Sequence, residues 1–199
     1  LRPVSAGRLD GRACLLREGK GTSFVDVRLR QADAEVATLS LVFVKPREGS
    51  LVAPEAAPPP SPAPATLEDV PYVPGAMPEF TQHLQMRWAR GGTPFSASAE
   101  AGFDGYCRFR VPTAGPEGLM ALLDAWPSPT LALVARPTFA STVSWTAHLV
   151  RVPASFEGWF HFEYRAIAGA EGFHTVAGRL FAPDGTFTAW SEQLVAVYD

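Results

Sequence analysis

A proline-rich stretch divides this chain into two parts and limits how each of them can fold. Residues 46–78 contain ten of the 19 prolines, including the run APPPSPAPA. Proline fixes φ and lacks a backbone N–H, so this stretch cannot lie inside a helix or a sheet. We therefore expect residues 46–79 to form an extended linker over the surface, with residues 1–45 before it and residues 80–199 after it.

The part before the linker has only short stretches with the two-residue periodicity of β-strands. GRACLLRE, SFVDVRLRQ and EVATLSLVFV are separated by the turn sequences GKGT and ADA. Residues 1–45 are therefore predicted to form strands without a helix.

The part after the linker combines one helix with several strands. In GPEGLMALLDAWPSP the leucines recur at helical spacing, Pro116 suits a first turn and Pro127 prevents continuation. This pattern predicts a helix over residues 116–126. Strands are expected in FTQHLQMRWARG and DGYCRFRVP, and over residues 142–150, 157–168, 172–182 and 187–197. One helix against a long antiparallel sheet is an α+β arrangement.

The two parts share a weak internal repeat at a constant separation of 149 residues. Residues 1–27 align with residues 150–176, so that Phe24 corresponds to Phe173. In the second copy a segment with the helix precedes the aligned strands, and in the first copy none does. We therefore expect the natural chain to extend by ~50–70 residues before Leu1.

Composition and charge argue against several classes of function. With 17 basic and 20 acidic residues the net charge is −3, and no basic stripe suits nucleic acid. No apolar run approaches the ~20 residues of a membrane span, so we expect a cytoplasmic protein. Cys14 and Cys107 form no CxxC motif and are predicted to be buried, reduced thiols.

Common catalytic motifs are absent from the sequence. There is no GxSxG, P-loop or HExxH pattern, and the four histidines lack metal-ligand spacing. We therefore expect neither a metal nor a cofactor. Asp124 follows Leu123 and precedes Trp126, where burial of a charge is costly unless the charge is paired or used. Taken alone, however, Asp124 at a helix end and Thr142 and Gln193 in strands are also compatible with ordinary surface positions.

Three segments together resemble the tandem, or double, hot-dog fold of type II acyl-CoA thioesterases and the wider thioesterase-like superfamily. They are LLDAWPSP, STVSWTAHLVRVP and LFAPDGTFTAWSEQLV, and the first copy matches through LRPVSAGRL and REGKGTSFVDVRLRQ. The resemblance implies an α+β double hot-dog, in which each long antiparallel sheet wraps around a central helix. Residues 1–45 would be the C-terminal part of a first repeat without its N-terminal strand and helix, and residues 80–199 the second repeat.

The resemblance also implies a catalytic site. In such thioesterases an Asp of the helix, a Ser or Thr of the following strand and a Gln of the last strand hold a water at the thioester carbonyl. These roles would belong to Asp124, Thr142 and Gln193, with water attack and no acyl-enzyme. The implied substrate is an acyl-CoA or related thioester, and a homodimer is compatible with the fold. Trp145, on the apolar face of its strand, is expected in the core.

Two other functions remain open, because a fold does not determine a function. One is a catalytically silent hot-dog protein that binds acyl groups or serves as an interaction module. The other is a dehydratase or hydratase, which would require an Asp–His pair; no histidine lies near Asp124 in the sequence, so we rank it last. Hydrolysis requires that Asp124, Thr142 and Gln193 meet at one water-sized point.

Overall fold

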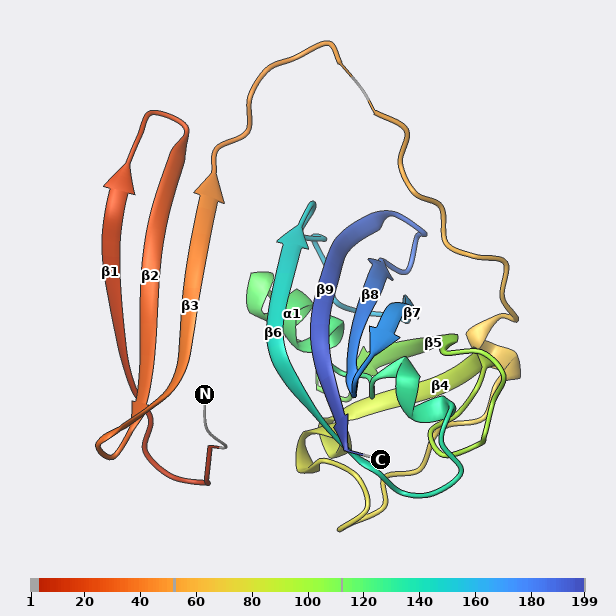
Figure 1. Cartoon of the computed structure of the whole chain (residues 1–199). Coiled ribbons are helices and arrows are strands. Elements are labelled where there is room, and N and C mark those ends of the chain that lie inside the picture. Colours follow the sequence, from red (N-terminus) through yellow and green to blue (C-terminus); the bar gives the residue numbers. More distant parts are fainter. Residues whose placement is uncertain (1–3, 52, 112, 199) are drawn as a thin grey trace. The chain divides into compact units, whose positions relative to one another are not determined.

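Two structural units make up the chain, Leu1–Ala53 and Pro54–Asp199 (Figure 1). The computed structural model describes residues 4–51, 53–111 and 113–198. The first three residues of the predicted first repeat lie outside the described residues. Within the described ranges, no helix has the length and apolar character needed to cross a bilayer.

The described part of the first unit forms an antiparallel sheet. Its strands are β1 (Asp10–Glu18), β2 (Thr22–Gln31) and β3 (Ala34–Val44), paired in the order β1-β2-β3. Within residues 4–51 the chain has no helix, as the sequence predicts. Val25 and Val27 of β2 pair with Leu41 and Leu39 of β3, so one face of this sheet is apolar.

Both cysteines are free, but their environments differ. Cys107 is buried, and burial raises the pKa of its thiol to about 12, which keeps it protonated at neutral pH. The prediction of a buried thiol is wrong for Cys14, which is exposed. The reason is that β1 is an edge strand whose residues are all exposed in the first unit.

The second unit, within residues 54–111 and 113–198, combines one α-helix and short 3-10 helices with six strands. In chain order these elements are η1 (Pro64–Thr66), η2 (Glu79–His83), β4 (Leu84–Gly91), β5 (Gly102–Phe109), α1 (Pro116–Leu123), η3 (Pro129–Ala132), β6 (Phe139–Leu149), β7 (Phe160–Ala170), β8 (Phe173–Phe181) and β9 (Phe187–Tyr198). The strands pair antiparallel in the order β4-β5-β7-β8-β9-β6, and α1 lies on one side of them (Figure 1). The predicted α+β arrangement is confirmed.

The core lies between α1 and one face of the sheet, which we call the inner face. Leu119, Leu122 and Leu123 of α1 are at most 1% exposed and belong to one apolar cluster with the inward-facing residues of the strands. Trp126 packs over Gly105 of β5, where an added Cβ would lie 2.7 Å from the indole ring. Glycine at this position therefore makes room for Trp126 beside the end of the helix.

The helix ends three residues earlier than the sequence predicts. Leu123 is its last residue, and Asp124 is the C-cap, with its backbone N–H donating to the carbonyl oxygen of Met120. A residue before proline avoids the helical conformation, so Pro127 acts on Trp126 and the chain leaves the helix ahead of both. The Asp124 side chain thus stands where the helix ends.

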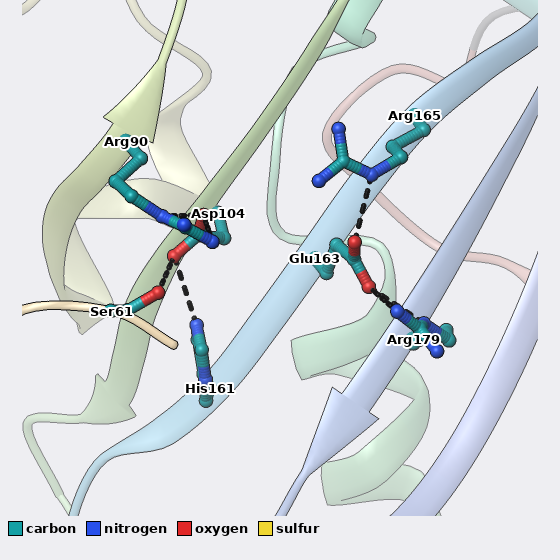
Figure 2. A network of polar contacts seen from close by, with 7 residues as sticks. All are labelled: Ser61, Arg90, Asp104, His161, Glu163, Arg165 and Arg179. Carbon is teal, nitrogen blue, oxygen red and sulfur yellow. Dashed lines mark hydrogen bonds and ion pairs between the residues drawn. The ribbon is translucent and has the colours of Figure 1, made fainter. Parts of the chain in front are cut away.

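The opposite, outer face of the sheet carries a buried carboxylate on β5, the second strand from one edge (Figure 2). Asp104 of β5 is 2% exposed and accepts hydrogen bonds from the Ser61 hydroxyl and from Arg90 Nε at 2.8 Å. His161 Nε2 lies 3.1 Å from the same carboxylate. Because Ser61 belongs to the proline-rich segment, this cluster fastens that segment to the sheet within the second unit.

A second buried carboxylate lies beside the first on the outer face (Figure 2). Glu163 of β7 is 5% exposed and pairs with Arg165, at 2.8 Å from its Nε, and with Arg179 of β8. Burial raises the pKa of both Glu163 and Asp104, but the hydrogen bonds to each outweigh it and the net pKa is lowered. The stabilisation by these carboxylates is therefore present above their unfolded-state pKa and is lost as the pH falls through the folded pKa.

Asp104→Ala is expected to lower the free energy of unfolding of the protein by roughly 1–3 kcal/mol, because Ser61, Arg90 and His161 lose their shared acceptor. Arg90 remains 44% exposed, which keeps the loss below that of a fully buried pair. Asp69→Ala, which removes the exposed partner of Arg87, is the matched control and should change stability little. Urea unfolding of the three proteins checks this, and equal effects of the two substitutions would contradict it.

Candidate active site

The three residues assigned from the sequence form one continuous hydrogen-bonded chain on the inner face. Gln193 of β9 donates from its Nε2 to Asp124 Oδ1 over 2.9 Å. Thr142 of β6 donates its hydroxyl proton to Gln193 Oε1 over 3.1 Å. An ionised carboxylate can only accept hydrogen bonds, so the amide nitrogen faces Asp124 and the amide oxygen is left for Thr142. The chain Thr142–Gln193–Asp124 joins β6, β9 and the end of α1.

A β-bulge in β6 brings Thr142 to the inner face. Regular alternation from Trp145 would place Thr142 with Ser144, on the other side of the sheet. In the ladder with β9, however, Thr142 pairs with Val195 and Ser144 pairs with Leu194, so Val143 is an extra residue. Val195 is 2% exposed on the inner face. The extra residue reverses the alternation, and both Thr142 and Trp145 face inward.

Ser144, Thr146 and His148 therefore lie on the outer face, away from the site. Thr146 pairs with Glu192 and His148 with Trp190 in the same ladder. The polar half of this strand's alternation does not line the candidate site.

Asp124 is accessible to solvent, but its surroundings disfavour the ionised form of its carboxyl group. The residue is exposed, as is Thr142, whereas Gln193 is only 6% exposed. Partial burial of the carboxyl group raises the pKa of Asp124, and the hydrogen bond from Gln193 offsets part of this effect. A carboxylate with a raised pKa is a stronger base than an ordinary aspartate, and it can be reached from solvent.

Sequence reasoning missed two further polar groups near the hydrogen-bonded residues Thr142, Gln193 and Asp124. The Trp145 indole Nε1 and the Ser191 hydroxyl are buried and have no hydrogen-bond partner among the described residues. Both side chains lie on the inner face with Gln193. Trp145 is directly opposite Gln193 in the ladder, and Ser191 lies two residues before Gln193 on β9. The periodicity of a sequence does not show whether a buried donor has a partner, because this depends on how the side chains pack in three dimensions.

Comparison with known proteins identifies a family. The chain matches the family described as "Acyl-CoA thioesterase C-terminal domain" over residues 54–197. A search among curated proteins gives no match.

Solved structures with the same fold include a hot-dog protein of unknown function from Alicyclobacillus acidocaldarius. It is 25% identical, with a TM-score of 0.84, over 95% of this chain and 72% of that one. The tesB protein of Mycobacterium avium subspecies paratuberculosis is 15% identical, with a TM-score of 0.79, over 100% and 75%. The acyl-CoA thioesterase II TesB2 of Mycobacterium marinum is 14% identical, with a TM-score of 0.75, over 94% and 73%.

These structural likenesses confirm the hot-dog fold that the resemblance implies. The family match supplies the activity, because it covers nearly the whole second unit, including Asp124, Thr142 and Gln193. The chain belongs to the acyl-CoA thioesterase C-terminal domain family and is a thioester hydrolase.

Proposed function

We propose that this protein hydrolyses an acyl-CoA or related thioester by direct attack of a water molecule that Asp124, Thr142 and Gln193 position. The observation that carries the proposal is the hydrogen-bonded chain from Thr142 through Gln193 to Asp124. It joins three elements that are distant in sequence, and it fixes which atoms of each side chain remain free. A site that only binds acyl groups has no need of a base held in this way.

The free atoms of this chain are suited to hold one water. Asp124 Oδ1 and Gln193 Oε1 accept the two hydrogen bonds within the chain, and Thr142 gives its proton to the second of them. Asp124 Oδ2 is then available to accept a proton from the water, and the Thr142 oxygen to accept a second hydrogen bond from it. The lone pair of the water is left to face the thioester carbonyl.

The reaction balances without a further reagent. The water oxygen bonds to the acyl carbon while one water proton passes to Asp124, which acts as general base. The tetrahedral intermediate then collapses, the carbon–sulfur bond breaks, and the departing thiolate takes the proton from Asp124. The products are a carboxylic acid and the free thiol, and no covalent bond to the protein forms.

Asp124→Asn is expected to lower kcat for thioester hydrolysis by ~10²–10⁴-fold, because the substitution keeps the shape of the side chain and removes the base. Glu192→Gln is the matched control. It also replaces a carboxylate with an amide, at the residue directly before Gln193 and on the outer face, and it should leave kcat unchanged. Turnover of a panel of acyl-CoA thioesters of different chain length measures both.

An unchanged rate in Asp124→Asn would contradict the assigned base while leaving thioester hydrolysis in place. If the wild-type protein turned over no thioester of the panel but still bound acyl-CoA, the silent acyl-binding module would be correct instead.

Thr142→Val is expected to reduce kcat by about tenfold, because loss of a hydrogen bond of about 1.4 kcal/mol corresponds to that factor. Valine keeps the shape of the side chain but cannot orient the Gln193 amide. Thr146→Val, on the outer face of the same strand, is the control that tests for a general effect on β6. Equal kcat values for the two variants would contradict the role of Thr142.

The pH dependence of kcat/KM should report the pKa of Asp124. The base acts only when ionised, so activity falls as the pH drops through its pKa. Because burial raises this pKa, the midpoint of the acidic limb is expected above the usual aspartate value of about 3.9. The residual activity of Asp124→Asn should lack this limb. A wild-type midpoint at or below the usual value would contradict the assignment.

A further inference from the structure

Water attack on a thioester requires a hydrogen-bond donor that the proposed function does not yet assign. As the carbon–oxygen bond forms, the carbonyl oxygen gains negative charge, and a fixed donor at this oxygen is among the largest contributions to catalysis. Thr142 gives its proton to Gln193 Oε1, and one of the two N–H groups of Gln193 donates to Asp124, so these three side chains leave a single N–H for the carbonyl oxygen. A further donor near Gln193 would complete the site.

Trp145 offers such a donor. It lies directly opposite Gln193 in the β6–β9 ladder, where Cβ atoms are about 5 Å apart. The bulge at Val143 lets Thr142 and Trp145 share the inner face, three residues apart, so that Thr142 is opposite Val195 and Trp145 is opposite Gln193 of β9. Its side chain is half-buried against the core, and its indole Nε1 is buried.

The indole N–H of Trp145 has no acceptor among the described residues. A buried tryptophan N–H usually finds a partner, and leaving a buried donor unpaired is unfavourable. The cost is understandable if the partner is the substrate, which is present only during the reaction. An unpaired donor beside a reactive group is then held ready for the charge that develops.

The other unpaired groups are placed differently. Trp88 and Trp126 also have buried, unpaired indole nitrogens, but their rings lie 5.3 Å apart in a cluster with Phe103. The Ser191 hydroxyl lies close to Gly178 of β8, where an added Cβ would be 3.0 Å from it, on the side of β9 away from β6. Trp145 is the unpaired donor of this set that stands opposite Gln193.

We infer that Trp145 is a catalytic residue whose indole N–H donates a hydrogen bond to the carbonyl oxygen of the thioester and stabilises the oxyanion of the tetrahedral intermediate. This inference rests on the proposed function. The indole keeps its proton throughout, so the balance of the reaction is unchanged. The N–H is required as a donor, and the ring alone does not supply this role.

The first test compares Trp145→Phe with Trp88→Phe, which removes an equally unpaired indole N–H from the aromatic cluster. Trp145→Phe should lower kcat by ~10²-fold with a smaller change in KM, because the donor acts mainly in the transition state. Trp88→Phe should keep kcat within a few-fold of the wild-type value. Thermal unfolding of both variants shows whether they are folded.

The second test does not depend on the activity of any variant. Each of the five tryptophans gives one indole N–H signal in a ¹H–¹⁵N spectrum. The probe is an acyl-CoA analogue in which a methylene group replaces the sulfur, so that the carbonyl remains and hydrolysis is impossible. The Trp145 signal, assigned by its loss in Trp145→Phe, should move downfield on addition of the analogue, as expected when the N–H gains an acceptor. The Trp88 signal should stay in place.

A Trp145→Phe variant with wild-type kcat, or a Trp145 signal that the bound analogue leaves unmoved, would overturn the inference. If Asp124→Asn is inactive in the same assays, the proposed function survives and this inference alone fails. Wild-type protein without any thioester turnover would instead remove the proposed function on which the inference rests.

Discussion

The hydrogen bond from the Gln193 amide to the Asp124 carboxylate is the interaction on which the site depends. It ties the end of α1 to β9, and it determines the orientation of the amide, since a carboxylate can only accept. That orientation leaves the amide oxygen as acceptor for Thr142 on β6. This one contact therefore determines which polar atoms of the three side chains remain available for further hydrogen bonds. Without it the three residues would be ordinary members of a helix end and two strands.

The carboxylates on the two faces of the sheet differ in the partners that they have. On the outer face, Asp104 and Glu163 are buried but each is paired with cationic or hydroxyl side chains, and their net pKa is lowered. On the inner face, the Gln193 amide is the hydrogen-bond partner of the Asp124 carboxylate among the described residues, and the pKa of Asp124 is raised. The first arrangement stabilises the fold. The second leaves a carboxylate without an ion-pair partner among the described residues, and its raised pKa suits it to accept a proton from water.

Periodicity predicted the strands and the single helix, because alternation and leucine spacing are local features of the sequence. The end of the helix was placed three residues too late, since the effect of Pro127 on the preceding residues competes with the leucine pattern. The identities of Asp124, Thr142 and Gln193 came from family-like segments and not from periodicity. Alternation alone would have put Thr142 on the wrong face, because one extra residue in β6 leaves no mark in the pattern.

The outer-face clusters were beyond the reach of sequence reasoning for another reason. The Asp104 cluster depends on the pairing of β5 with β4 and β7, which places Arg90 opposite Asp104 and brings His161 close to it. The Glu163 cluster depends on the pairing of β7 with β8, which places Arg179 opposite Glu163. The role of Ser61 in the proline-rich segment depends on the position of Asp104 in this sheet. The proline content predicts an extended segment, but the contact of Ser61 with the sheet follows only from the assembled structure.

In the proposed reaction, water attacks the thioester carbon directly and no acyl-enzyme forms. A single turnover in H₂¹⁸O, with mass spectrometry of both the released acid and the intact protein, tests it most directly. One ¹⁸O atom is expected in the acid, and the mass of the protein should not rise by an acyl group at any time during the reaction. An unlabelled acid with ¹⁸O in the protein, or a transient acylated protein, would contradict it.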